Sequence, residues 1–247
     1  MADFDSVIDD LIAANRILAA EGVVDSFGHV SVRHPERADR FLISRNKSPQ
    51  IVQPEDIMTM DFGGNEVKPT GRAPYGERFI HAAIYAARPE VGAVVHSHSR
   101  TTIPFGVTEE RLRPISHVSA TIGAEVPIWD PQDQFGDTNM LVSSIELGHD
   151  LARSLADRPA ILMRGHGSTI VGQELRDAVY TAVYLEVNAQ LQLQARLLNA
   201  GAIKFLTAGE IEKFAAHLNR HNPNVGYDKA WENWCIKCGQ PYKPRAM

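Results

Sequence analysis

Residues 92–99 read Gly-Ala-Val-Val-His-Ser-His-Ser, a short apolar run that ends in two histidines. A short apolar run rich in β-branched residues predicts a buried strand. Successive side chains of a strand point to opposite faces, so His96 and His98 share one face at its end. Two neutral imidazoles side by side form half of a metal site, of a kind that suits zinc and also iron, copper or nickel.

A third histidine gives this pair more weight. Ten histidines placed at random in 247 residues would produce roughly 0.4 pairs at this spacing, so the pair alone is weak evidence. His166 stands between Gly165 and Gly167, directly after the apolar run 160–163, and these glycines allow a tight turn between strands. His166 is therefore either a third ligand or a surface histidine in a hairpin.

Length, composition and charge indicate a globular enzyme. The chain of 247 residues can form one α/β domain, and 44% hydrophobic with 22% charged residues is ordinary for such a protein. A formal net charge of −5 argues against nucleic acid and anionic membranes as partners. No apolar stretch approaches the roughly 20 residues that span a bilayer, and the acidic N-terminus does not read as a signal peptide. We therefore expect a cytoplasmic protein.

The hydrophobic pattern predicts helices alternating with short strands. Helices are expected over residues 6–21, 76–87, 141–156 and 174–199, with a last helix opening at the capping box 207–210. Strands are expected over residues 24–33 (after an initial turn), 41–44, 57–62, 92–99 and 113–129, with a strand pair over 160–172. The aromatic tail, about residues 222–247, is expected to be irregular.

The tail holds the two cysteines of the chain, Cys235 and Cys238, which form no disulfide framework. A lone C-x-x-C is a redox pair, half of a zinc site completed by another chain, or a chance spacing, and we favour chance or local packing. Tyr227 and Trp231 either cap a pocket or anchor the tail on the surface of the domain.

Five local patterns follow one another along the chain. They are FGHVSVR at 27–33, PEDI at 54–57, GERFIH at 76–81, the strand of His96 and His98, and RGHG at 164–167. In this order, over about residues 6–200, they resemble the class II aldolase/adducin family. The sequence shows no internal repeat, low-complexity tract or linker, so we expect a single domain over 1–247. The resemblance implies that it is built as a three-layer α/β/α sandwich around a central, largely antiparallel sheet. It also implies a homo-oligomer, commonly a cyclic tetramer.

The resemblance gives individual residues a role. It implies one divalent metal ion per subunit held by His96, His98 and His166; we expect zinc, with manganese, iron or cobalt as alternatives. Three histidine ligands leave positions open for a substrate. Glu77 stands at the position of the family's acid/base glutamate, although a carboxylate at a helix start is also stabilised by the helix dipole alone. His81, one turn later, is either a partner of the site or a packed core histidine.

Three elements depart from the sugar-phosphate aldolases that the chain resembles. Gly28-His29 replaces Gly-Asn, the segment Ser44-Arg45-Asn46-Lys47 replaces a loop of Thr/Ser, Pro and Gly, and Tyr75-Gly76 replaces two serines. Because those elements hold the phosphate in such aldolases, a phosphorylated sugar is disfavoured. Arg45 offers a planar fork for a carboxylate and His29 a further hydrogen bond, unless Arg45 is simply an exposed charge at a strand end.

His117 lies about where the aldolases place a proton-donating tyrosine that reaches a neighbouring subunit. It is interpreted as a proton donor or a substrate contact, with a buried structural histidine as the alternative.

The pattern is most similar to the decarboxylase branch of the family, whose members act on hydroxylated aromatic or pyridine carboxylates or on ring-cleavage hydroxy-dienoates. We expect a lyase in which the metal binds two substrate oxygens and stabilises the enolate or phenolate left by departing CO₂. Glu77, or a water that it orients, would then protonate the carbon. The expected contacts to this small-molecule carboxylate are Gly28, His29, Ser44, Arg45 and His117.

Other functions stay open. An aldolase acting on an unphosphorylated hydroxy-keto acid or sugar needs the same metal chemistry and would release pyruvate or an aldehyde. An epimerase or dehydratase fits the altered anion loop less well. A non-enzymatic interaction module, like the adducin head domain, would bind no stoichiometric metal.

Overall fold

The computed structural model describes residues 4–198, 201–218, 227–242 and 244. Its strands are β1 (His29–Arg33), β2 (Arg40–Ser44), β3 (Ile57–Asp61), β4 (Ala93–Ser97), β5 (Ile128–Trp129), β6 (Ala160–Met163) and β7 (Gly167–Gly172). They form a seven-stranded sheet in the order β3-β2-β1-β4-β7-β6-β5. All neighbouring strands are antiparallel except β5 and β6, which are parallel. The expected largely antiparallel sheet is confirmed.

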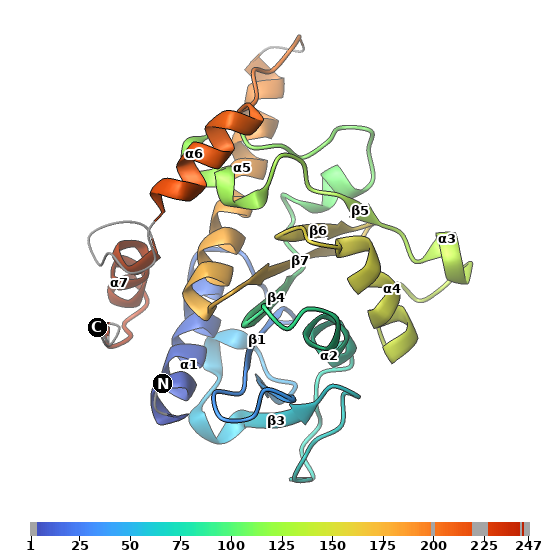
Figure 1. Cartoon of the computed structure of the whole chain (residues 1–247), viewed down its shortest axis with the longest axis vertical. Coiled ribbons are helices and arrows are strands. Elements are labelled where there is room, and N and C mark those ends of the chain that lie inside the picture. Colours follow the sequence, from blue (N-terminus) through green and yellow to red (C-terminus); the bar gives the residue numbers. More distant parts are fainter. Residues whose placement is uncertain (1–3, 199–200, 219–226, 243, 245–247) are drawn as a thin grey trace.

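Helices lie on both faces of the sheet (Figure 1). They are α1 (Phe4–Ala20), α2 (Arg78–Ala87), α3 (Gln132–Phe135), α4 (Ile145–Leu155), α5 (Leu175–Leu198), α6 (Ala208–His217) and α7 (Tyr227–Lys237). Short 3₁₀ helices are η1 (Pro49–Ile51), η2 (Pro54–Asp56), η3 (Ile103–Gly106) and η4 (His117–Ile122). Helices α1 and α5 pack into the hydrophobic cluster on one face, and α2 and α4 into the cluster on the other. The three-layer α/β/α sandwich is therefore confirmed.

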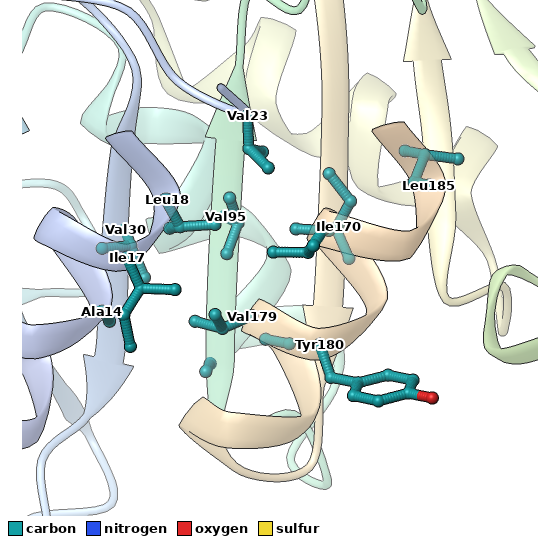
Figure 2. Packing of buried hydrophobic residues seen from close by; sticks show 14 of the residues in the cluster. Ala14, Ile17, Leu18, Val23, Val30, Val95, Ile170, Val179, Tyr180 and Leu185 are labelled. Carbon is teal, nitrogen blue, oxygen red and sulfur yellow. The ribbon is translucent and has the colours of Figure 1, made fainter. Parts of the chain in front are cut away.

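The two-residue period of the central strands separates the two faces. Val95 and Ile170 point toward α1 and α5 (Figure 2), whereas their neighbours Val94 and Val171 belong to the cluster under α2 and α4. His96 has the same parity as Val94, so it faces α2. The end of β4 that holds His96 therefore faces α2, the helix that begins directly after Glu77.

The two glycines around His166 have different roles in the turn between β6 and β7. Gly165 has a φ of 63°, in the left-handed region that glycine adopts without steric cost. A Cβ atom on Gly167 would lie 1.9 Å from the carbonyl oxygen of Ser97, so β7 approaches β4 as closely as it does only because this side chain is absent. The predicted strand pair over 160–172 is confirmed.

Most predicted elements are found with shifted ends. Helix α2 begins at Arg78 with Glu77 as its N-cap, and α4 begins at Ile145 because the Ser144 hydroxyl accepts a hydrogen bond from the Leu147 amide. The capping box formed by Thr207 and Glu210 is confirmed. Residue 199, the expected end of α5, lies outside the described residues.

The expected strand over 113–129 is wrong. Only Ile128–Trp129 pairs with the sheet, and His117–Ile122 forms η4. Helix α5 supplies side chains where a strand would supply backbone: Asn188 bonds the Ile115 amide and the Arg113 carbonyl, at 2.9 and 2.7 Å. The backbone of this segment is thus satisfied without a neighbouring strand.

The expected irregular tail is wrong for residues 227–237, because Tyr227–Lys237 forms α7, whereas the described residues after this helix are irregular as expected. This helix contacts α1 and α5, and Trp231 is only 1% exposed. The buried Arg176 of α5 bonds Asp228 at 3.0 Å, and its guanidinium lies 5.2 Å from the Trp231 ring centroid. Trp231 therefore anchors the tail, whereas Tyr227, which is also buried, lines a cavity beside α5. Residues 222–226 lie outside the described part of the chain.

Cys235 and Cys238 are free thiols on and just after α7. Burial raises the pKa of Cys235 to about 12, so its thiol stays protonated and packs as an apolar group. This agrees with the local-packing interpretation. Among the described residues, no helix combines the length and apolar character needed to cross a bilayer.

Candidate active site

Four side chains converge where β4 ends. His96 and His98 come from the end of β4, His166 from the turn between β6 and β7, and Glu77 from the start of α2. The Nε2 atom of His98 lies 3.1 Å from that of His96 and 3.0 Å from that of His166. Oε2 of Glu77 lies between 3.5 and 3.9 Å from the three Nε2 atoms. The structure therefore brings together the three expected ligands and the expected acid/base.

Each of these histidines turns its other ring nitrogen, Nδ1, toward an oxygen atom. The partners are the carbonyl of Ser168 for His96 (3.2 Å), the carbonyl of Met140 for His166 (2.8 Å) and the carboxylate of Asp25 for His98 (3.6 Å). A neutral imidazole that donates through Nδ1 carries its lone pair on Nε2. Three lone pairs then face one point, an arrangement that a shared cation stabilises, so the donor set fits a divalent ion that accepts imidazole.

Glu77 is 8% exposed, and its two oxygens have different partners. Oε1 accepts a hydrogen bond from the Val142 amide at 3.0 Å, and Oε2 faces the histidines. Burial alone would raise the pKa of Glu77, but the electrostatic influence of His166, His96 and His98, whose rings face its Oε2 atom, outweighs burial and holds the pKa far below its ordinary value. The Glu77 carboxylate therefore faces the cluster as an anion, in a fixed orientation.

His29 lies beside this cluster. In the β1–β4 ladder it is directly opposite His96, so both side chains share the α2 face of the sheet, with ring centroids 5.0 Å apart. Its Nδ1 atom is 2.7 Å from Nε2 of His81. Burial lowers the pKa of both imidazoles, that of His81 to about 3. His81 is therefore a buried core histidine, and it is also hydrogen-bonded to His29, a predicted substrate contact. Both interpretations of His81 thus describe the same side chain.

Gly28 permits this placement. A Cβ atom on Gly28 would lie 2.6 Å from Cγ1 of Val24 and 3.0 Å from the carbonyl oxygen of His96. Real Cβ atoms do not approach a side chain so closely, so any larger residue would push the start of β1 away from β4. The missing side chain of Gly28 is therefore what lets β1 and β4 lie this close together.

The Ser44–Lys47 segment reaches the site through Tyr75. The Tyr75 ring lies 4.4 Å from the His29 ring, and its hydroxyl donates to the Lys47 carbonyl and accepts from Ser44 at 3.5 Å. Tyr75 therefore packs its ring against His29 while its hydroxyl bonds residues at the end of β2.

Arg45 has an acidic partner within the chain. Its Nε–H donates to Asp56 at 2.7 Å, and Lys47 binds the other oxygen of Asp56 at 2.6 Å. Burial would raise the pKa of Asp56, but these hydrogen bonds lower it to about 2. The planar fork of Arg45 is thus shared with Asp56, and only its terminal nitrogens lack a hydrogen-bonding partner among the described residues.

His117 stands apart from the cluster within one chain. It is exposed at the start of η4, and its ring lies edge-on to Phe214 of α6 with centroids 5.4 Å apart. The interpretation as a buried structural histidine is therefore wrong. Its proposed part in catalysis would require a second subunit.

Sequence reasoning missed several residues that orient the site. Met140 and Val142 act through backbone atoms, which leave no signature in side-chain chemistry. The sequence did contain a signal for Ser31 and Tyr85, which extend the hydrogen bonds of His81. Ser31 is two residues after His29 on a strand, and Tyr85 is four residues after His81 on a helix, so each shares a face with its neighbour.

The sequence matches the profile of the Class II Aldolase and Adducin N-terminal domain over residues 9–193, and the chain belongs to this family. It is 38% identical over 206 residues to the decarboxylase tropJ of Talaromyces stipitatus, a match that covers 78% of this chain and 77% of the relative. It is 31% identical over 240 residues to a 3,4-dihydroxyphthalate decarboxylase of a Terrabacter species, covering 92% and 94%.

The fold is similar to that of L-fuculose 1-phosphate aldolase from Glaciozyma antarctica, with a TM-score of 0.76 and 25% identity over 97% of this chain and 94% of the other. The resemblance drawn from the sequence is thereby confirmed. The relatives are decarboxylases and aldolases, and the chain is a lyase of the class II aldolase family.

Proposed function

We propose that this protein is a divalent-metal-dependent decarboxylase of hydroxylated aromatic carboxylates, or of hydroxy-dienoates derived from ring cleavage. The observation that carries the proposal is the convergence of Nε2 of His96, His98 and His166 on Oε2 of Glu77. The similarity to two decarboxylases over most of the chain supports carboxy-lyase chemistry over the other reactions of the family.

The metal would be held by the three histidines through Nε2. A divalent ion there, zinc as the first choice and manganese, iron or cobalt as alternatives, would supply a Lewis acid that binds substrate oxygens and stabilises negative charge. Ser168, Met140 and Asp25 orient the rings from behind, as the partners of metal-binding histidines do.

Glu77 would move the proton. Loss of CO₂ breaks the bond between the carboxyl carbon and the ring or chain carbon and leaves an electron pair on that carbon. A proton must then be added at the same carbon. Because Glu77 is an anion, it would orient a water molecule that gives this proton, or would first take a proton from such a water and then pass it to the carbon. The Val142 amide fixes Oε1, so Oε2 is presented to the reacting side of the cluster.

The acid group of the substrate would be bound by His29 and by the terminal nitrogens of Arg45, next to Gly28 and Ser44. A guanidinium and an imidazole N–H both suit a carboxylate. The buried Tyr75 ring between these groups supports a flat, partly apolar substrate.

The test is CO₂ release by metal-loaded protein from a panel of ortho-hydroxy aromatic acids. The matched pair of variants is Glu77→Gln and Glu125→Gln, the latter an exposed glutamate outside the cluster. We expect Glu77→Gln to retain stoichiometric metal and to lose at least 100-fold in kcat, while Glu125→Gln behaves as wild type. Undiminished CO₂ release by Glu77→Gln would remove Glu77 from the role.

A second function is favoured by the fold shared with L-fuculose 1-phosphate aldolase. An aldolase acting on an unphosphorylated hydroxy-keto acid or sugar would use the same cluster. Pyruvate or an aldehyde among the products, with no CO₂, would decide for it. Absence of both turnover and stoichiometric metal would favour an interaction module instead.

We also propose that the protein is a homo-oligomer, a tetramer as in the family it resembles, in which His117 serves the site of a neighbouring subunit. The exposure of His117, away from the cluster of its own chain, supports this. Mixing inactive His117→Ala and Glu77→Gln subunits should restore part of the activity, because some sites then receive both groups. Failure of the mixture to recover activity, after subunit exchange is verified, would contradict a shared site.

A further inference from the structure

A buried series of hydrogen bonds leads from the interior of the protein to His29. His29 and Ser31 lie two residues apart on the α2 face of β1, and His81 and Tyr85 lie four residues apart on α2. The two spacings are nearly equal, about 6–7 Å, so the four side chains alternate between strand and helix. The contacts are His29 Nδ1 to His81 Nε2 (2.7 Å), His81 Nδ1 to Ser31 Oγ (2.6 Å) and Ser31 Oγ to Tyr85 Oη (2.8 Å).

The direction of these bonds follows from counting protons. All four side chains are at most 2% exposed, and no carboxylate of the described residues bonds either His29 or His81, so both imidazoles are neutral. Each of the four groups then has one proton, and three bonds consume three of the four. The fourth proton remains at one end of the series, on Oη of Tyr85 or on Nε2 of His29.

Leaving the fourth proton unpaired on the hydroxyl of Tyr85 is energetically unfavourable. Its hydroxyl is buried, and among the described residues Ser31 is the only hydrogen-bonding acceptor within reach of that proton. Leaving a buried hydroxyl proton without an acceptor costs about 1–3 kcal/mol. Nε2 of His29 is not among the fully buried polar atoms without a partner in the described residues, so water or a substrate oxygen can accept a proton there. The lower-energy arrangement therefore has Tyr85 donating to Ser31, Ser31 to His81, and Nε2–H of His81 to Nδ1 of His29.

We propose that Tyr85, Ser31 and His81 fix His29 as an N–H donor that binds the acid group of the substrate through Nε2. Because His29 is opposite His96, its ring borders the histidine cluster, and its Nε2 atom has no hydrogen-bonding partner among the described residues. His29 then binds an oxygen acceptor and cannot serve as a base. Ser31, His81 and Tyr85 are positioning residues that touch no substrate.

The claim that His29 binds the acid group of the substrate rests on the proposed function, whereas the claim that His29 is protonated on Nε2 does not. Nitrogen-15 NMR of zinc-loaded protein labelled in its histidine rings reads the tautomers directly, without any reaction. Spectra of His29→Gln and His81→Gln assign the two rings. We expect both rings to be protonated on Nε2 and bare on Nδ1. Protonation of Nδ1 on His29 overturns the proposal, whether or not the protein releases CO₂.

Binding of 2-hydroxybenzoate, measured by calorimetry, tests the consequence. We expect Ser31→Ala to weaken binding about tenfold and to mix the tautomers of His29, whereas Ser119→Ala, a buried serine on η4, changes neither. In a His29→Phe background the Ser31→Ala change should have no further effect, because it acts only through His29. Equal losses in both backgrounds would show a merely structural effect and overturn the proposal.

If Ser31→Ala fails to fold, Tyr85→Phe is measured in its place, with the tautomer of His29 as the readout. It should leave His29 protonated on Nε2, because Ser31 can still donate to His81, and a change of the His29 tautomer in this variant would contradict the proton count. If the tautomers are as expected but no acid releases CO₂, the donor remains and only the proposed function fails.

Discussion

The carbonyl oxygen of Met140 lies 2.8 Å from Nδ1 of His166, and Met140 adopts a left-handed φ of 68°. Two residues further on, the amide of Val142 bonds Oε1 of Glu77. One loop therefore orients both a candidate metal ligand and the candidate acid/base. A non-glycine residue at positive φ costs on the order of 1 kcal/mol or more, and such strain is typical of functional sites.

Replacing Met140 by proline should weaken metal binding. Proline fixes φ near −65°, so the carbonyl can no longer face His166. Loss of a partner behind a metal-binding histidine lowers affinity about 10–100-fold. Met140→Gly is the matched control, because glycine keeps the left-handed backbone and should bind metal like the wild type. Competition with a chromogenic chelator measures both; equal affinities for the two variants would contradict this role of the loop.

Gly28→Ala should disturb the site through the backbone. Its new Cβ atom would meet Val24 at 2.6 Å and the His96 carbonyl at 3.0 Å, and such overpacking costs about 1–3 kcal/mol. Gly76→Ala is the control, since a Cβ atom there has no neighbour within 4 Å. Denaturant unfolding and metal titration should show losses for the first variant alone. A fully stable Gly28→Ala protein would show that β1 can shift without cost.

The parts of the site that rest on short-range spacing were predictable from the sequence. The two-residue period aligned His96 with His98, and the glycines around His166 indicated its turn. The expected strand over 113–129 failed because Asn188, more than 70 residues later, takes the place of a strand partner. The backbone partners Met140 and Val142 also depend on long-range folding, which no local pattern reports. Sharing of the Arg45 fork with Asp56 likewise became visible only in three dimensions.

Trp231→Ala should destabilise the whole protein, because α7 is part of the packed structure. Trp231 is 1% exposed and lies against Arg176, and truncating a buried tryptophan costs about 3–5 kcal/mol. Ile236 on the same helix is 70% exposed, so Ile236→Ala should change the free energy of unfolding by no more than about 0.5 kcal/mol. Denaturant titrations of the two variants give the comparison. Similar stabilities would mean that α7 docks only loosely.

Asp56→Asn should remove a pH-dependent contribution to stability. The pKa of Asp56 is lowered to about 2 in the folded protein, from about 4 when unfolded. A lowered pKa stabilises the fold above the unfolded value and loses this effect as the pH falls through the folded value. Because Arg45 and Lys47 are partly exposed, we expect about 1–2 kcal/mol at pH 7. The difference between wild type and variant should be constant above pH 5 and shrink between pH 4 and 2. A difference that persists at pH 2 would point to packing instead of charge.

Arg45→Lys should separate substrate binding from chemistry. The terminal nitrogens of Arg45 lack hydrogen-bonding partners in the described chain while Nε is held by Asp56, so the guanidinium is oriented before a carboxylate arrives. Lysine keeps the charge and loses the fork, and its ammonium can pair with Asp56 alone. We expect KM for the carboxylate substrate to rise about tenfold with kcat within about twofold, since binding of the intact acid and of the transition state weaken together. Arg37→Lys, on an exposed turn, should leave both constants unchanged. A fall in kcat at unchanged KM would instead place Arg45 at the departing CO₂, because only an interaction formed in the transition state gives that pattern.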